Sequence, residues 1–233
     1  MNKYELVDSN MLFDGHTQLY RIRALKDFDD VRKGELGGFV ESTFNLSQAG
    51  NCWIYGKNVV WGNARISENA KLYDKIHCSR MFIGNIQVCD DARIYGNARI
   101  YGNAEIYDNA RIYESAKVFG NAQVYDGVRI YGSALVFDDV ICHDNARIYG
   151  KAKVRHNAKI YGDSSIFNNA EIDNYCQVYE NAQVYGNAKV CGHSKVCGNS
   201  QVYEDAMVFG NIIVEGGSRI NGQAVTHSQV ILK

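Results

Sequence analysis

The chain has 233 residues, 46% of them hydrophobic, and a formal net charge of −1 at pH 7. This near-neutral charge excludes the global basic field that draws nucleic acid to a protein, and no stretch approaches the roughly 18 apolar residues of a membrane span. The first residues lack the apolar segment of a signal peptide. We therefore expect a cytoplasmic protein with no membrane contact and with free cysteine thiols.

The N-terminal segment, residues 1–45, contains none of the repeats that follow it. Residues 18–25 read as a strand, and residues 34–40 read as a turn that leads into the repeats. The end of a stacked array of repeats exposes unpaired strand edges and apolar core. We therefore predict that residues 1–45 form a cap.

A six-residue repeat occupies residues 46–233. From Ala92 the chain reads ARIYGN, ARIYGN, AEIYDN, ARIYES, AKVFGN and keeps this phase to its end. An earlier run covers residues 46–75, with the hexads CWIYGK, NVVWGN, ARISEN and AKLYDK. Two residues are missing from the register near 76–79, where we expect a bulge or a tightened corner. The chain has no proline, which indicates that nearly every backbone N–H group is needed for strand pairing.

Each hexad predicts one short strand followed by one corner. Side chains alternate between the two faces of a strand, so Ala92 and Ile94 should point inward and Arg93 and Tyr95 outward. The next two residues, glycine and asparagine at 96–97, tolerate the left-handed backbone of a tight turn. Three hexads would make one triangular coil of about 18 residues, and about ten coils would stack at roughly 4.8 Å.

These repeats resemble the hexapeptide-repeat left-handed β-helix. Within that class the chain is most similar to the YdcK-like β-solenoid family, which carries tandem A-x-V-Y-G-N-A units, and the resemblance covers about 80% of the chain. It implies an all-β fold, a single-stranded left-handed parallel β-helix with a short N-terminal cap.

Outward residues that recur at the period of one coil should form columns, and one face combines arginine with tyrosine. Its members are Arg93, Tyr95, Arg111, Tyr113, Arg129, Tyr131, Arg147 and Tyr149. Such a face could stack bases or hold a polyanion, or it could be a ladder of aromatic rings that stabilises the stack. An aspartate lies three residues before each arginine, at Asp90, Asp108, Asp126 and Asp144. We expect these aspartates to neutralise the arginines, which favours the stabilising ladder.

The last coils turn apolar residues outward in the register of the repeat, namely Met207, Phe209, Ile213, Val225 and Ile231. Outward apolar residues at one end of a stack indicate a surface for self-association or for a partner. We therefore expect the C-terminal coils to support a homo-oligomer or a protein complex.

The resemblance also raises acyl transfer, because acyltransferases on this helix use a histidine base, a loop that protrudes between coils, and an acyl-CoA site between the subunits of a trimer. The candidate bases are His143, His156, His193 and His227. None of them lies on an insertion, so we predict no catalytic residue. Cys191 and Cys197 fall on different faces, and a zinc site needs four converging ligands, so we predict no metal and no cofactor.

The sequence hypothesis is a non-enzymatic β-solenoid scaffold. It would bind a protein partner through a flat face or through its apolar C-terminal end, and an inhibitor of a host protein encoded by a phage is one version. Two alternatives remain: nucleic-acid or polyanion binding by the Tyr/Arg face, and a hexapeptide-type acyltransferase.

Overall fold

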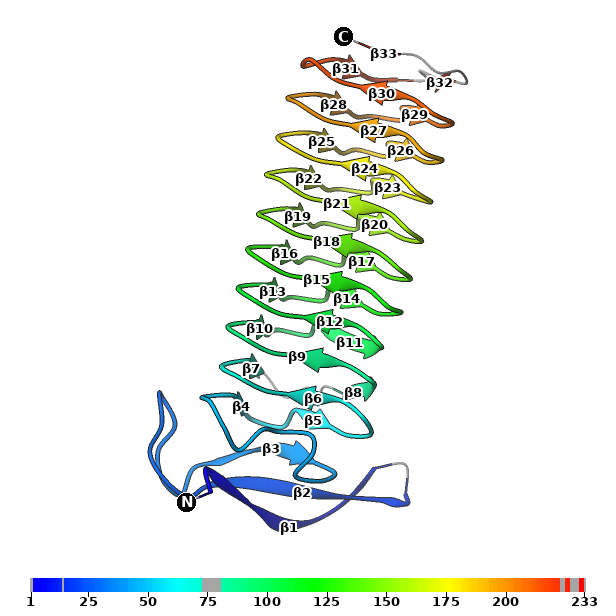
Figure 1. Ribbon diagram of the computed structural model, residues 1–233. Coiled ribbons are helices and arrows are strands. Elements are labelled where there is room, and N and C mark those ends of the chain that lie inside the picture. Colours follow the sequence, from blue (N-terminus) through cyan, green and yellow to red (C-terminus); the bar gives the residue numbers. More distant parts are fainter. Residues whose placement is uncertain (1, 14, 73–80, 223–224, 227–230, 233) are drawn as a thin grey trace.

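The computed structural model describes residues 2–13, 15–72, 81–222, 225–226 and 231–232. The chain winds repeatedly around one axis, and the strand numbers rise from one end of the stack to the other (Figure 1). Strands of successive coils lie side by side and form three sheets. The predicted parallel β-solenoid is therefore confirmed, and the predicted register break near 76–79 lies outside the described residues.

Among the described residues, two of the sheets have ten strands and one has thirteen. The first sheet contains β4 (Trp53–Ile54), β7 (Lys71–Leu72), β10 (Arg93–Ile94), β13 (Arg111–Ile112), β16 (Arg129–Ile130), β19 (Arg147–Ile148), β22 (Ser165–Ile166), β25 (Gln183–Val184), β28 (Gln201–Val202) and β31 (Arg219–Ile220). The second contains β1 (Tyr4–Phe13), β2 (Thr17–Ala24), β3 (Leu36–Val40), β5 (Val59–Val60), β8 (Met81–Gly84), β11 (Arg99–Gly102), β14 (Lys117–Val118), β17 (Leu135–Val136), β20 (Lys153–Val154), β23 (Glu171–Ile172), β26 (Lys189–Val190), β29 (Met207–Val208) and β32 (Val225–Thr226). The third contains β6 (Arg65–Ile66), β9 (Gln87–Val88), β12 (Glu105–Ile106), β15 (Gln123–Val124), β18 (Ile141–Cys142), β21 (Lys159–Ile160), β24 (Gln177–Val178), β27 (Lys195–Val196), β30 (Ile213–Val214) and β33 (Ile231–Leu232).

The strands of successive coils pair in parallel, with identical hexad positions opposite each other. In the first sheet Arg93 lies opposite Arg111, and Arg111 lies opposite Arg129. Backbone bonds between coils follow the same register, and the N–H of Arg93 donates to the carbonyl of Ala110 at 2.9 Å. A proline at such a position would remove the donor, which gives the absence of proline a structural reason.

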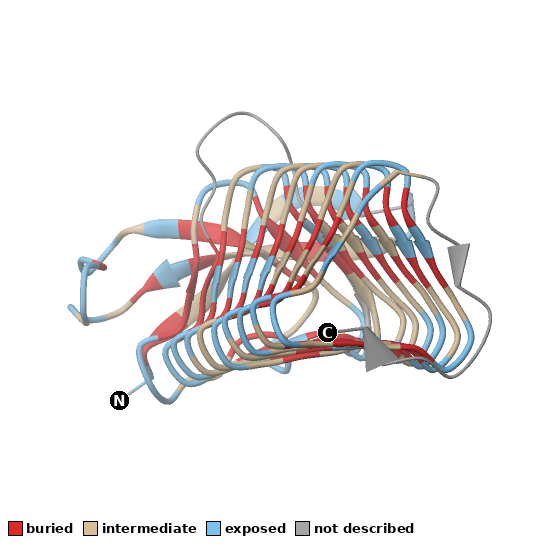
Figure 2. Cartoon of the chain, turned by 90° about the horizontal axis from the view of Figure 1, so that it is seen from above, coloured by how far each residue is buried: buried red, intermediate tan, exposed pale blue. Residues whose placement is uncertain are grey.

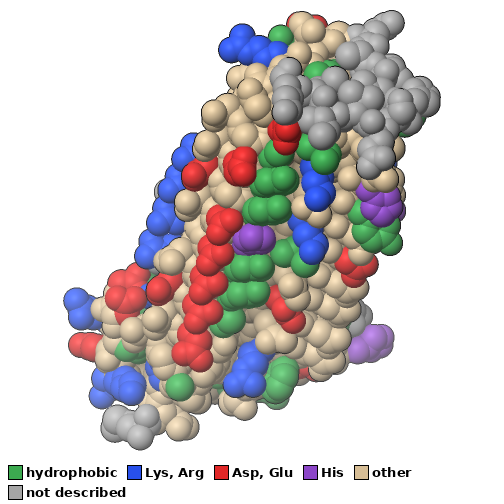
Figure 3. All heavy atoms as spheres, turned by 45° about the horizontal axis from the view of Figure 1, so that its top comes forward, with side chains coloured by type: hydrophobic (Ala, Val, Ile, Leu, Met, Phe, Trp, Pro, Cys, Tyr) green, Lys and Arg blue, Asp and Glu red, His purple; other side chains and the backbone are tan. Residues whose placement is uncertain are grey.

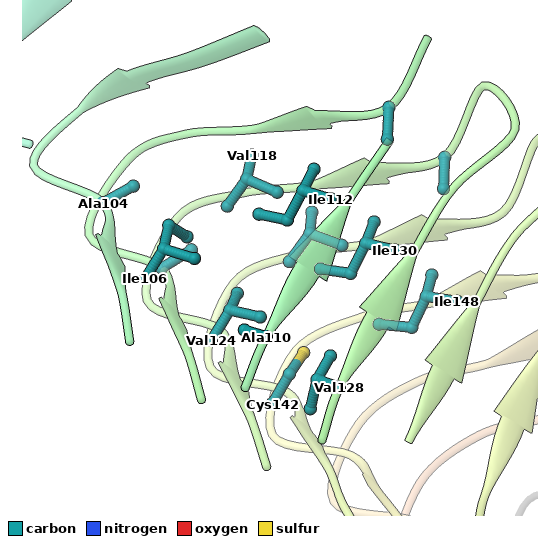
Figure 4. Packing of buried hydrophobic residues seen from close by; sticks show 14 of the residues in the cluster. Ala104, Ile106, Ala110, Ile112, Val118, Val124, Val128, Ile130, Cys142 and Ile148 are labelled. Atoms are coloured by element: carbon teal, nitrogen blue, oxygen red, sulfur yellow. The ribbon is translucent and has the colours of Figure 1, made fainter. Parts of the chain in front are cut away.

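The core consists of the first and third residues of each hexad. Ile112, Ile130 and Ile148 are fully buried and lie one above another (Figure 4). Seen from above, buried and more exposed positions alternate along every coil (Figure 2). This alternation confirms the predicted inward and outward assignments, including exposed Arg93 beside buried Ala92 and Ile94.

The corners contain aspartates in the left-handed region, and their carboxylates bind the backbone of the next coil. Asp126 has φ 55° and Asp144 has φ 59°. Asp126 Oδ2 accepts the N–H of Asp144 at 3.1 Å, and Asp144 Oδ2 accepts the N–H of Gly162 at 2.9 Å. The expected neutralisation of the arginine column is therefore wrong, since within the described residues no acid forms an ion pair with Arg93, Arg111, Arg129 or Arg147.

The N-terminal strands depart from the solenoid pattern. Strands β1 and β2 form an antiparallel pair, and β3 pairs antiparallel with β2 and parallel with β5. A buried lysine joins this segment to the coils, because Lys71 Nζ lies 2.7 Å from Asp29 and also contacts Asp30 and the hydroxyl of Tyr55. The side chain of Lys71 is only 6% exposed, so these partners compensate a buried charge.

No helix in the described part of the chain has the length and hydrophobicity that a membrane crossing requires.

Candidate functional site

The Tyr/Arg face forms on the first sheet, and its aromatic rings stack directly on one another. Ring centroids lie 4.9 Å apart for Tyr95 and Tyr113 and 4.8 Å apart for Tyr113 and Tyr131, with planes within 3° of parallel. The ring of Tyr149 continues the stack, with its centroid 4.8 Å from that of Tyr131. Stacked rings at this spacing stabilise neighbouring strands, so the face contains the predicted ladder.

The predicted C-terminal apolar surface is described in part. Met207 is exposed, and Phe209 and Ile213 are partly exposed. The side chains of Val225 and Ile231 lie outside the described residues. The hypothesis of a protein partner or of a homo-oligomer at this end stays a prediction.

On the second sheet the repeat changes its chemistry partway along the stack. The outward column begins with stacked aromatic rings, Tyr101 against Phe119 at 4.5 Å and Phe119 against Phe137 at 4.7 Å. In the next three coils the same column position is occupied by Arg155, Asp173 and Cys191. A run of reactive side chains in an otherwise aromatic column marks this segment as a candidate site.

Two coils contribute a histidine and a carboxylate that bind each other at this position. His156 is the first corner residue after β20, and Asp173 follows β23 one coil further on. The Nδ1 atom of His156 forms a hydrogen bond with Oδ1 of Asp173. His156 is half exposed, whereas the side chain of Asp173 is 19% exposed. The carboxylate therefore lies inside the corner and the imidazole extends toward solvent.

Three further donors hold the Asp173 carboxylate. Arg155 donates to Oδ2 through Nε at 2.9 Å and through its terminal nitrogen at 2.7 Å. The backbone N–H of Asn174 donates to Oδ1 at 2.6 Å. Partial burial on its own would raise the pKa of Asp173, but the hydrogen bonds from His156, Asn174 and Arg155 outweigh it and lower the pKa. Asp173 is thus an anion near neutral pH.

An anionic acceptor at Nδ1 fixes which nitrogen of the imidazole carries the proton. The carboxylate can only accept, so neutral His156 carries its proton on Nδ1. Its Nε2 atom then bears the free lone pair. A partly buried carboxylate that fixes Nδ1 of a half-exposed histidine and leaves Nε2 without the proton is the arrangement of a general base held in one orientation.

The neighbouring thiol is not activated. Burial raises the pKa of Cys191, and the negative charge of Asp173 raises it further. A thiol held in its protonated form is a poor nucleophile. The site therefore favours proton transfer by His156 over a covalent intermediate on Cys191.

A second histidine lies beside a carboxylate on the third sheet. Figure 3 shows a column of acidic side chains next to stacked hydrophobic side chains, with a histidine within the stack. His143 lies between Tyr125 and Tyr161, and its Nδ1 is 3.3 Å from Asp144 Oδ2. Asp126, His143 and Asp144 offer three possible metal ligands within 4.8 Å of one another. Because the two carboxylates also bind backbone N–H groups of the next coil, this cluster has a structural role without a metal.

Sequence reasoning identified His156 as a candidate but missed its partner. The two residues are 17 positions apart, so only the stacking of coils brings them together. One feature of the sequence could have pointed to Asp173 as the partner. It replaces an aromatic residue in the column next to that of His156.

The fold and the repeat define the class of this protein as a parallel β-solenoid scaffold of hexapeptide type. The YdcK β-solenoid repeat matches residues 87–102 and 92–105. The chain is also 33% identical over 103 residues to the "Uncharacterized acetyltransferase YdcK" of Escherichia coli strain K12. That alignment covers 38% of this chain and 32% of the relative, so the chain spans about a third of the length of the curated protein. The resemblance to the YdcK-like β-solenoid family is thus confirmed.

The same comparison overturns one prediction. The chain was expected not to be an enzyme, whereas the curated relative is named an acetyltransferase. That expectation rested on the absence of a histidine from an inserted loop. In the structure a corner of the coil exposes His156 while the next coil supplies its carboxylate.

Proposed function

We propose that this protein is an acetyltransferase in which His156 acts as the general base. The observation that carries the proposal is the His156–Asp173 pair at the corner where the aromatic column of the second sheet ends. The name of the curated relative supports the same reaction class. The donor would be an acetyl thioester such as acetyl-CoA, and the acceptor an amine or a hydroxyl group.

The chemistry assigned to the chain is a proton transfer. As the acceptor nitrogen or oxygen attacks the thioester carbonyl, its proton passes to Nε2 of His156. The carbon–sulfur bond breaks, the acetyl group stays on the acceptor, and the leaving thiolate takes the proton from the imidazolium, which restores neutral His156. Asp173 stabilises the imidazolium that forms, and Arg155 and Asn174 keep the carboxylate in place.

The test measures thiol release from acetyl-CoA in the presence of a mixture of amines and alcohols. His156→Gln should lower the rate by roughly a hundredfold or more, the typical contribution of a general base. Asp173→Asn should also lower the rate, because its amide would donate to Nδ1 and move the imidazole proton to Nε2. Arg155→Lys keeps the charge but loses the two-pronged contact, and we expect an intermediate rate.

The matched control is His143→Gln, which removes a second histidine that lies beside a carboxylate. This variant should keep the wild-type rate. Loss of activity in His143→Gln but not in His156→Gln would refute the assignment. Binding gives an independent readout, since acetyl-CoA should raise the melting temperature of the wild type and of His156→Gln alike. No rise at millimolar acetyl-CoA would contradict the reaction class itself.

A further inference from the structure

Four arginines form a continuous positive row on the first sheet. Arg93, Arg111, Arg129 and Arg147 lie directly opposite one another on β10, β13, β16 and β19, and all four are exposed. Neighbouring arginines are separated by one strand spacing, roughly 4.8 Å. Like charges placed directly opposite on adjacent strands destabilise a sheet, so this row needs a compensating interaction.

The chain itself does not supply that interaction within its described residues. The ion pairs in that part of the chain join other residues. The acid closest in sequence is Asp91, two residues before Arg93, and a corner acid lies three residues from each arginine. The carboxylates of these corner acids bind backbone N–H groups of the next coil, namely those of Asp90, Asp108, Asp126, Asp144 and Glu114. The guanidinium groups therefore remain available to an external anion.

The row has defined ends. The next residues in the same column are Ser165, Gln183 and Gln201, which carry no charge. At the other end Arg93 lies opposite Lys71, whose side chain is buried against Asp29 and Asp30. The available positive row therefore spans three strand spacings, roughly 14 Å. A single small anion would meet one or two of these arginines, whereas a linear polyanion would meet all of them.

The adjacent tyrosines decide what kind of polyanion the face accepts. Tyr113 is covered on one ring face by Tyr95 and on the other by Tyr131, at 4.9 and 4.8 Å with planes within 3° of parallel. A base stacks on a ring only where the ring face is free. The interior rings of this ladder present only their edges and hydroxyl groups to a ligand, so base stacking is not available there.

We propose that this face binds a linear chain of phosphate groups, recognised by its charges and not by nucleobases. Arginine suits this ligand because its planar guanidinium donates two parallel hydrogen bonds to phosphate oxygens. A phosphate in contact with a guanidinium lies closer to that cation than to the carboxylates around the corner. Screening by salt over roughly 8 Å weakens the more distant repulsion further. The site is separate from His156, which lies at a corner between the second and third sheets.

The test uses two sources of phosphate chains and one chemical control. A short labelled single-stranded oligonucleotide is titrated by fluorescence anisotropy, beside an oligonucleotide of the same length with abasic sites in place of its bases. Inorganic polyphosphate is the competitor. The two oligonucleotides should bind with similar affinity, and polyphosphate should displace both. Binding should weaken as salt rises, because phosphate contacts release counterions.

The variant Arg111→Gln with Arg129→Gln removes the two central charges. Glutamine is compatible with this column, because Gln183 and Gln201 occupy it in the same chain. Affinity should fall roughly tenfold or more, and the salt dependence should become shallower. Lys117→Gln with Lys159→Gln is the matched control, since it removes two charges from the other sheets, and this variant should bind like the wild type.

Three results would overturn the proposal. One is the absence of binding by both the oligonucleotides and polyphosphate at low salt. Another is an equal loss of affinity in the arginine and lysine variants, which would assign binding to net charge alone. The third is binding of the normal oligonucleotide without binding of the abasic one, which would mean that bases reach a ring face.

Discussion

Replacement of Ile130 by aspartate tests the inward assignment at the centre of the stack. Ile130 is fully buried between Ile112 and Ile148. Loss of the buried apolar side chain removes about 2–3 kcal/mol of stabilisation. The introduced carboxyl group would meet only apolar neighbours and would stay protonated. At pH 7, about three pH units above the ordinary pKa of aspartic acid, keeping it protonated costs about 4 kcal/mol. The free energy of unfolding should therefore fall by about 6–7 kcal/mol.

The pH dependence separates the two contributions. The folded-state pKa of the introduced group is raised, so the protonation cost disappears as the pH falls to the ordinary pKa of the unfolded chain. Near pH 4 the variant should lie only about 2–3 kcal/mol below the wild type at the same pH. Chemical denaturation followed by circular dichroism at both pH values measures this difference.

The neighbouring position provides the control. Arg129 is exposed, so Arg129→Asp should change stability by less than about 1 kcal/mol. A fully stable Ile130→Asp variant at pH 7, or an Arg129→Asp variant that is equally destabilised, would refute the alternation of inward and outward residues.

Four further substitutions test the stack, its corners and its N-terminal contact. Tyr113→Ala removes two stacked ring contacts and should lower the free energy of unfolding by about 1–3 kcal/mol, measured by urea denaturation. Gly120→Ala would place a Cβ 2.5 Å from a backbone nitrogen of the next coil at φ 76°, whereas Gly62→Ala at φ 64° would meet nothing within 4 Å. Gly120→Ala should therefore lower the free energy of unfolding by about 2–4 kcal/mol, and Gly62→Ala by about 1 kcal/mol. Equal melting temperatures of the two variants would contradict the close approach of neighbouring corners. Burial on its own would raise the pKa of Asp30, but hydrogen bonds from Lys71 and Tyr55 outweigh burial and lower this pKa. The ionised Asp30 therefore stabilises the fold above the ordinary aspartate pKa. This stabilisation is lost as the pH falls through the lower pKa of the folded state. Asp30→Asn should accordingly lower the melting temperature at pH 7 and reduce the loss of stability between roughly pH 5 and pH 3.

The repeat determined the fold because each hexad carries all the information for one strand and one corner. Alternation assigned Ala92 and Ile94 to the core and Arg93 and Tyr95 to the surface, and the structure agrees. The spacing of the repeat also placed the tyrosines in one column. These properties are local, so they could be predicted without knowledge of the stack.

Tertiary structure alone decided which outward groups bind each other. His156 meets Asp173 because stacking places a corner residue of one coil beside a strand-end residue of the next. Asp126 binds a backbone N–H group and not an arginine, because its left-handed backbone directs the carboxylate along the stack. The tyrosine rings cover one another's faces because the strand spacing nearly equals the separation of stacked rings. The alternation of residues fixes the face on which a side chain lies, whereas its partner depends on side-chain direction at the corners and on the close spacing of the coils.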